Sequence, residues 1–329
     1  MIPMLTSINT NIDGGNYISR GTLQVNPALA NLGIEDLLEK SDLNFQVGKI
    51  QTSYDYLGQH IESKSHSIIR LDTGKELGFG ATKEYEPVSY QRAIYDVFGE
   101  DISDKMKNIG GIPTRVISLH NGARAAFQFV LPEIWKVAGK IHRTFFNIFG
   151  SHDRSSGVGF NTSDICIVCG NTYLRAFASK ELRSFAKHTA NVHSKLVELS
   201  KAILTIRAES VEYYTVLDNA ATVTVNSDTV AAFTALLFPD TNGGEKRQSK
   251  AADNRRDELM AAINVSRAER EGYTASGALT VYDVFQGALR FTSYKEQKRN
   301  ADEQFEYVMD GPGNIKNTMA YNWLLEAVK

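Results

Sequence analysis

The spacing of apolar residues changes along the chain, and this change restricts the folds that it can adopt. From Ser67 to Cys169, short apolar runs are separated by turn signals such as Asn121-Gly122, a pattern typical of antiparallel strands. After Asn171, apolar residues recur every three or four positions, as they do on one face of a helix. Because strands come first and helices follow, the sequence predicts an α+β fold, with a central antiparallel sheet packed by long helices and a helical C-terminal half.

The same patterns predict where individual elements lie. Strands are expected at residues 67–71, 77–79, 116–119, 125–131, 144–149 and 165–169, with a polar loop at 150–162. Helices are expected at residues 89–98, 174–206 (one long helix or two in line), 250–263, 279–294 and 318–328. Residues 1–65 are expected to form an irregular lead-in with one helix near 32–43, followed by a single domain over 66–329 with a mobile basic loop near 240–250.

Positive charge is concentrated in two parts of the chain, although the net charge is only -2. Residues 140–207 carry 10 basic and 4 acidic residues, and residues 245–300 carry 11 basic and 8 acidic residues. The remaining segments are acidic. An anionic partner would therefore be attracted by these two basic segments and not by the net charge of the whole chain. A solvated basic face without any partner would have the same composition.

The first basic part contains a stripe of cations. The predicted helix at 174–206 places four bases opposite its apolar face, namely Lys180, Arg183, Lys187 and Lys201. A solvated helix face usually carries acids four residues from its bases, and here only Glu198 interrupts the stripe, which favours a surface that follows phosphates. The full set of candidate phosphate-binding residues is Arg143, Arg154, Arg175, Lys180, Arg183, Lys187, Lys201, Lys246 and Arg247.

Aromatic residues lie among these cations. Sequence-neutral binding of a single strand needs rings on which bases stack, next to cations that follow the backbone. Phe146 and Tyr173 are the candidates for stacking, and most of the other Phe residues at strand spacing are expected in the core. The domain over 66–329 is therefore predicted to bind single-stranded nucleic acid.

No complete motif of an enzyme is present in the sequence. Gly157-Val158-Gly159 lacks the third glycine of a dinucleotide-binding turn, and Thr73-Gly74-Lys75-Glu76 has Glu where a phosphate loop needs Ser or Thr. No pair of carboxylates is placed by spacing where acid–base chemistry could be argued. We therefore expect a protein that is not an enzyme and that has no cofactor.

A metal site is the alternative that the cysteines and histidines leave open. Cys166 and Cys169, followed by His188 and His193, have a spacing loosely like that of a zinc site. The segment around the two cysteines is apolar and reads as a buried strand, on which residues three apart face opposite sides. Buried structural thiols are therefore expected, and no metal.

The sequence contains no segment that would target the chain to a membrane. No run approaches the roughly 20 apolar residues that span a bilayer, and the first ten residues lack the pattern of a signal peptide. Two cysteines are too few for the disulfide framework of a secreted scaffold. A cytoplasmic location is expected.

Several short motifs resemble the ordered landmarks of a phage- and plasmid-encoded family known only as a domain of unknown function. The resemblance spans about residues 80–329 and is carried by Glu84-Tyr85-Glu86-Pro87-Val88, residues 151–156, residues 165–172, Lys187-His188-Thr189, residues 272–274 and 281–288, and Gly311-Pro312-Gly313. It implies a phage origin and a role in replication, recombination or transcription. No active site is implied.

Size, landmarks and charge pattern are also similar to those of the single-stranded-DNA-binding RNA polymerase cofactors of virulent podoviruses. This resemblance implies a protein that holds melted promoter DNA for middle-gene transcription in the bacterial host cell. Its expected partners are single-stranded DNA, a phage RNA polymerase and further copies of the chain. The alternatives are a single-strand annealing, recombination or replication protein and, from other classes, a metal-dependent enzyme or a scaffold that binds only proteins.

Overall fold

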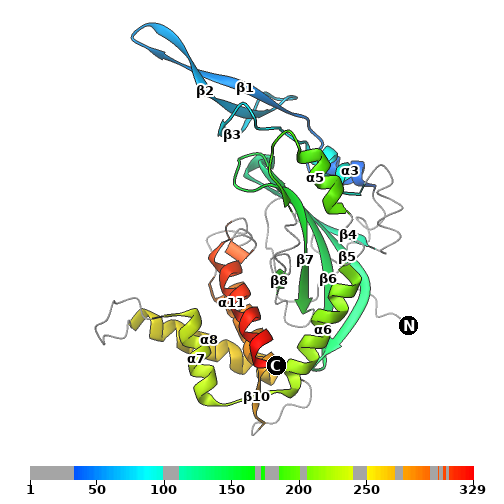
Figure 1. The fold of residues 1–329 in the computed structure, drawn as a ribbon, viewed down its shortest axis with the longest axis vertical. Coiled ribbons are helices and arrows are strands. Elements are labelled where there is room, and N and C mark those ends of the chain that lie inside the picture. The colour runs from blue at the N-terminus through cyan, green and yellow to red at the C-terminus, as the bar shows by residue number, and fades with distance from the viewer. Residues whose placement is uncertain are drawn as a thin grey trace.

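The computed structural model describes residues 33–98, 111–166, 172–174, 185–200, 206–239, 250–270, 277–296, 303, 307–308 and 311–329. A three-stranded sheet projects from one end, a six-stranded sheet lies in the middle, and helices gather at the other end (Figure 1). All the strand pairs within the sheets are antiparallel. The predicted α+β class is confirmed.

The three-stranded sheet consists of β1 (Val47–Tyr56), β2 (Gln59–Arg70) and β3 (Glu76–Ala81), in the order β1-β2-β3. It follows a short helix, α2 (Ile34–Lys40), which agrees with the one helix predicted in the lead-in. The sequence indicated no strand before Ser67, and this was wrong. Most side chains of β1 are exposed or half-buried, so β1 lacks the alternation of apolar and polar residues by which a half-buried strand is recognised.

The six-stranded sheet has the order β4-β5-β6-β7-β8, and β9 pairs with β7 next to it. The strands are β4 (Ile112–Leu119), β5 (Arg124–Val137), β6 (Lys140–Ser151), β7 (Val158–Cys166), β8 (Thr172–Leu174) and β9 (Phe185–Ala186). A 3-10 turn, η1 (His120–Gly122), joins β4 to β5, where the sequence predicted a hairpin.

The polar loop expected at 150–162 is shorter than predicted, because β7 already begins at Val158. The polar residues of β7 are buried and are bonded across the sheet. The Asn147 side-chain amide on β6 donates to Asn161 Oδ1 at 2.8 Å and to Ser163 Oγ at 3.1 Å. Lateral hydrogen bonds of this kind allow a polar run to form a buried strand.

The continuous helical stretch expected at 174–206 is also wrong. Leu174 ends β8, and Phe185 and Ala186 form β9 against Gly159 and Val158 of β7. Helix α5 spans only Val192–Ser200, and α6 (Ile206–Thr222) follows it. The spacing of three to four apolar residues therefore came from short strands and a helix together, and the predicted basic stripe is not one face of a single helix.

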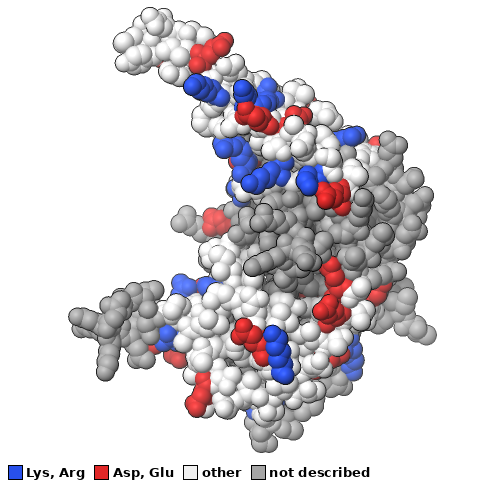
Figure 2. Space-filling model, viewed as in Figure 1, with Lys and Arg blue, Asp and Glu red and all other residues white. Residues whose placement is uncertain are grey.

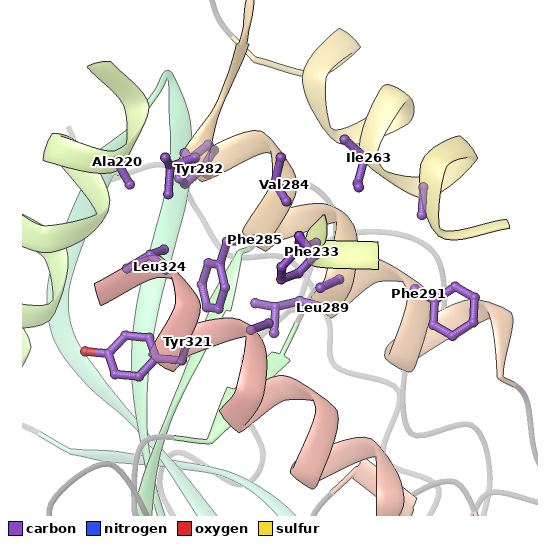
Figure 3. Close-up of a cluster of buried hydrophobic side chains, with 14 of the residues drawn as sticks. Ala220, Phe233, Ile263, Tyr282, Val284, Phe285, Leu289, Phe291, Tyr321 and Leu324 are labelled. Carbon is purple, nitrogen blue, oxygen red and sulfur yellow. The ribbon is translucent and has the colours of Figure 1, made fainter. Parts of the chain in front are cut away.

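The C-terminal half is helical, as predicted. It contains α7 (Ser227–Leu237), α8 (Lys250–Ala268), α9 (Val281–Arg290) with a π-helical extension η3 (Phe291–Lys295), and α11 (Pro312–Ala327). Short strands β10 (Thr224–Val225) and β11 (Leu279–Thr280) pair before α9. Figure 3 shows Phe233, Phe285 and Leu289 meeting in the core of this half. Gly287 allows α8 and α9 to approach, since a Cβ there would lie 2.6 Å from the Ile263 Cα atom.

Both helical groups pack on the same face of the six-stranded sheet. Alternate residues of β6 point to one side. On this side Phe146 and Ile148 pack in a core with α3 (Tyr90–Phe98) and α5, whereas Thr144 lies near Tyr214 of α6. The sheet is therefore the common support of both cores. Among the described residues, no helix is long and apolar enough to cross a membrane.

A buried carboxylate joins the sheet to the C-terminal helices. Asp164 on β7 accepts hydrogen bonds from the hydroxyls of Tyr213 at 3.2 Å and Tyr214 at 2.6 Å, both on α6. His142 on β6 places its Nδ1 atom 3.0 Å from the same carboxylate and its Nε2 atom 2.9 Å from the Tyr282 hydroxyl on α9. All five side chains are at most 2 % exposed. The network is therefore satisfied internally.

Replacing Asp164 by Asn should destabilise the protein strongly. The amide cannot accept all three hydrogen bonds and brings its own N–H groups toward donors, so we expect a loss of about 3 kcal/mol in the free energy of unfolding. Urea denaturation of Asp164→Asn beside Asp218→Asn, an exposed position on the same helix as Tyr213, measures the difference. Equal stability of the two variants would show that the network does not hold the helices to the sheet.

Candidate nucleic-acid interface

The three-stranded sheet contacts the six-stranded sheet at the turn that joins β6 to β7. Gly78 of β3 lies directly against this turn: a Cβ at Gly78 would meet the His152 carbonyl oxygen and lie 2.7 Å from the Asp153 Cα atom. The Arg124 Nε atom donates to Asp153 Oδ2 at 2.5 Å. Burial alone would raise the pKa of Asp153, but hydrogen bonds from Ser155 and the Arg124 guanidinium lower it. The turn is therefore fixed on both sides.

This turn presents Arg154 to solvent. Arg154 has a left-handed backbone, with φ at 68°, which directs its exposed side chain toward β3. Its Nη1 atom donates to the Phe79 carbonyl oxygen at 3.2 Å. The Phe79 side chain is itself 64 % exposed. The guanidinium lies on the side of β3 to which Gly78 and Gly80 are turned, so it and the exposed Phe79 ring belong to opposite faces of this strand.

Three lysines lie around the same junction. The Lys49 ammonium on β1 donates to the carbonyl oxygens of Lys83 and Tyr85, which places β1 beside the segment after β3. The Tyr85 ring stacks on His188 at 4.7 Å, and the Glu86 amide donates to the His188 carbonyl oxygen at 3.1 Å. These contacts hold the exposed Lys187 at the junction, because it precedes His188.

We call Lys49, Lys83, Arg154 and Lys187 the junction cations. Figure 2 shows Lys and Arg side chains gathered where the three-stranded sheet meets the rest of the chain, with acidic side chains among them. Glu84 and Glu86 are exposed there, and Glu84 lies 3.8 Å from the Lys83 ammonium. The four cations outnumber these two acids, so the local field is positive.

Exposed tyrosines lie further along the hairpin, on the face of the sheet opposite to Lys49. In the antiparallel register Tyr54 faces Ile61 and Tyr56 faces Gln59, and paired residues share one face of a sheet. Ile50 lies on the same face as Tyr54, since alternate residues of a strand point the same way. Tyr54 is 56 % and Tyr56 61 % exposed. We call Ile50, Tyr54 and Tyr56 the aromatic sheet face.

Neither Phe79 nor the aromatic sheet face was predicted from the sequence. The signal that could have found the hairpin is Tyr54-Asp55-Tyr56 followed by Leu57-Gly58, an alternation that ends in a turn. In the structure Leu57 and Gly58 both have positive φ, at 48° and 76°, as the tight type I′ hairpin turn requires.

Of the predicted phosphate contacts, the structure brings Arg154 and Lys187 to one junction. Tyr85 lies between them. Burial raises the pKa of the Tyr85 hydroxyl, the Arg154 charge lowers it by a smaller amount, and the Tyr85 ring stacks on His188, which follows Lys187. Six other candidates lie outside the described residues, namely Arg175, Lys180, Arg183, Lys201, Lys246 and Arg247. Tyr173 lies in β8, and its side chain also lies outside what the structure describes.

Two predicted contacts are corrected by the structure. Arg143 is only 8 % exposed, and burial lowers its pKa. Phe146 is fully buried between Phe129 and Phe160, at ring distances of 6.5 and 5.1 Å. Both residues lie on β6, a central strand with β5 on one side and β7 on the other. Neither contributes to the surface at the junction.

Two buried histidines lie beneath the junction cations. The His152 ring lies 4.5 Å from the Tyr90 ring, 6.0 Å from Phe45 and 6.5 Å from His188. Neither of its ring nitrogens has a hydrogen-bond partner among the described residues. Burial, with a smaller effect from His188, lowers the pKa of His152 to about 3, and burial also lowers the pKa of His188. Burial therefore favours the neutral form of both rings.

Among the described residues, which do not include the Cys166 side chain, no three His, Cys, Asp or Glu side chains cluster. The His188 Nδ1 atom lies 3.1 Å from the Glu86 carbonyl oxygen, and its ring stacks on Tyr85. Cys169 lies outside the described residues.

Comparison with known proteins identifies a family. The family described as "Domain of unknown function (DUF932)" matches residues 83–308. The matched range contains Lys83, Arg154 and Lys187 but not the three-stranded sheet. No curated protein and no solved structure is similar to the chain.

The buried histidines predict that the protein loses stability in mild acid. His152 has a pKa of about 3 in the folded chain against an ordinary 6.5, so between these values the unfolded chain binds more protons. Stability present above pH 6.5 is then lost as the pH falls, by about 2 kcal/mol at pH 5 for this one group. Urea denaturation measures the free energy of unfolding at pH 7 and at pH 5. The decrease between these pH values should be smaller in His152→Phe than in the unmodified chain by about this amount.

Tyr90→Phe provides the matched control. It removes a hydroxyl that donates to the Gly122 carbonyl oxygen at 2.8 Å and should lower stability equally at both pH values. If His152→Phe keeps the full pH dependence of the unmodified chain, the titrating group lies elsewhere.

Proposed function

We propose that this chain, which belongs to the DUF932 family of domains of unknown function, is a non-enzymatic protein that binds single-stranded DNA. The observation that carries the proposal is the exposed Arg154 guanidinium bonded to the backbone of the exposed Phe79, among the other junction cations. A single strand offers phosphates to cations and unpaired bases to rings at the same time. A duplex keeps its base faces stacked inside and can use only the cations.

The arrangement of charge and rings supports this reading. Lys and Arg side chains gather at the base of the hairpin (Figure 2), and the aromatic sheet face follows β1 toward the hairpin tip on the face opposite to Lys49. Each ring that stacks on a base contributes about 1–3 kcal/mol, without regard to which base it meets. The net charge of -2 means that attraction to DNA arises from this local group of cations and not from the chain as a whole.

The resemblance to podoviral RNA polymerase cofactors supports a more specific role. In this role the bound strand is the melted promoter, and the protein recruits the phage RNA polymerase to it for middle-gene transcription. A non-enzymatic binding protein fits this role, since recruitment needs two binding surfaces and no reaction. The corresponding location is the cytoplasm of the bacterial host.

Removing two junction cations should weaken binding in a salt-dependent way. For Arg154→Gln/Lys187→Gln we expect weaker binding to every single-stranded sequence and a slope of log affinity against log salt that is flatter by about 1.4, because each phosphate contact to a single strand contributes about 0.7. Fluorescence anisotropy with a labelled oligonucleotide at several salt concentrations measures this slope, with the matching duplex as a comparison.

The control for this variant removes the same charge elsewhere. Lys136 lies 12 residues along β5 from Arg124, which contacts the β6–β7 turn, and Lys329 is exposed at the C-terminus beyond α11. Lys136→Gln/Lys329→Gln should bind with the original slope. Identical slopes for both double variants would remove the junction from consideration as the phosphate-binding site.

Replacing Phe79 by Ala should weaken binding without changing the salt dependence. Its exposed ring acts by stacking and carries no charge, so a loss of about 1–3 kcal/mol is expected at each salt concentration. The same anisotropy titration measures it. Phe79→Tyr keeps a ring of similar area and should bind nearly as well as the unmodified chain. Loss of binding in both variants would indicate a structural role for Phe79.

A further inference from the structure

Strand β1 is a long edge strand. It comprises 10 residues, and in the sheet order β1-β2-β3 it pairs only with β2 among the described residues. Proteins usually protect such edges by short strands, prolines or several lysines. No proline occurs between Val47 and Tyr56, and the only lysine, Lys49, is directed to the carbonyl oxygens of Lys83 and Tyr85. The pairing of β1 with β2 shifts register between Gln51 and Ser53, but the extra residues are on β2. The backbone of β1 itself has no inserted residue and is therefore available as a template for another strand.

The side chains of β1 are complementary to a second, antiparallel β1. When Thr52 is placed on a two-fold axis, Lys49 of one copy faces Asp55 of the other, and Ile50 faces Tyr54. Opposite charges pair on one face of the joined sheet and apolar side chains on the other. Asp55 is 79 % exposed, and its His60 partner is on β2 of the same hairpin, so its carboxylate is accessible to a lysine.

We propose that two copies of this chain pair edge to edge through β1, with Thr52 on the two-fold axis. If the two-fold axis passes through any other residue of β1, Lys49 no longer faces Asp55. Lys49 has three N–H donors, of which two point to carbonyl oxygens of its own chain, so one remains for the carboxylate of the second copy. Ile50 is 48 % and Tyr54 56 % exposed, and in this register each faces the other residue of the second copy.

Pairing also has a consequence for nucleic-acid binding, which rests on the proposed function. The two three-stranded sheets become one continuous sheet, and the two-fold axis perpendicular to it keeps both aromatic sheet faces on the same side. Each dimer then offers one uninterrupted row of rings on one face of the joined sheet, and Lys49 of each copy lies on the other face. A single strand could cross both copies, so pairing lengthens the site without adding a new kind of contact.

A disulfide at the axis tests the register. Antiparallel partners lie about 4.5–5.5 Å apart at their Cα atoms, within the range that a disulfide bridges, so Thr52→Cys should form a covalent dimer under mild oxidation. Asp55→Cys is the matched control: its two copies would stand six residues apart, about 20 Å, and should stay monomeric on a non-reducing gel. Equal cross-linking of both variants, or of neither, overturns the register.

A charge exchange across the pair tests the interface without covalent bonds. Ile50→Lys/Tyr54→Lys places lysine opposite lysine and should sediment as the 36.5 kDa monomer, whereas Ile50→Lys/Tyr54→Glu places lysine opposite glutamate and should remain a dimer like the unmodified chain. Both variants change exposed side chains only, so folding is retained. A monomeric unmodified chain, or a Lys/Lys variant that stays dimeric, overturns the proposal.

Sedimentation velocity without nucleic acid separates this proposal from the preceding one. A monomer that binds a single strand with a salt-dependent slope contradicts pairing through β1 and leaves the binding function in place. A dimer that binds no single strand contradicts the binding function and leaves the pairing in place.

Discussion

The buried carboxylate of Asp164 is the interaction on which the arrangement of the two halves depends. A carboxylate is costly to bury, and here its hydrogen bonds come from β6 and α6, with α9 joined through His142. Apolar contacts would tolerate small shifts of the helices along the sheet. Three directed hydrogen bonds to one residue do not, because each shift would leave a buried hydroxyl or ring nitrogen without a partner. The helical half is thus fixed in one position on the sheet.

The other end of the sheet is fixed in a different way, by close packing around the β6–β7 turn. Gly78 admits the turn backbone where any side chain would collide with it, and His152 fills an aromatic pocket as a neutral ring. The position of Arg154 is a consequence of this packing, since it follows the two residues that Gly78 contacts. A solvent-exposed cation is therefore placed by buried neighbours, and it needs no reorganisation when an anion arrives.

The sequence predicted the parts of the fold in which apolar residues form a continuous run or recur with a simple period. The strand around Phe127 is a buried apolar run that follows the Asn121-Gly122 turn, and α8 buries one face, so these patterns indicated them. β1 is exposed over most of its length, and the polar residues of β7 are buried through lateral bonds, so neither shows the expected period. For the site, composition indicated Arg154, but exposure decides which rings are usable. Phe146 lies on a central strand and is buried, whereas Phe79 lies on an edge strand.

The range of the family match divides the interface into two parts. It begins at residue 83, so Lys83, Arg154 and Lys187 belong to the matched domain, while β1, β2 and β3 precede it. The residues expected to bind phosphates are therefore largely those of the shared domain, and the exposed rings and the free edge are supplied by the sheet before it. Phosphate contacts give affinity that is common to any strand, whereas rings and pairing set how the strand is held and how long the site is.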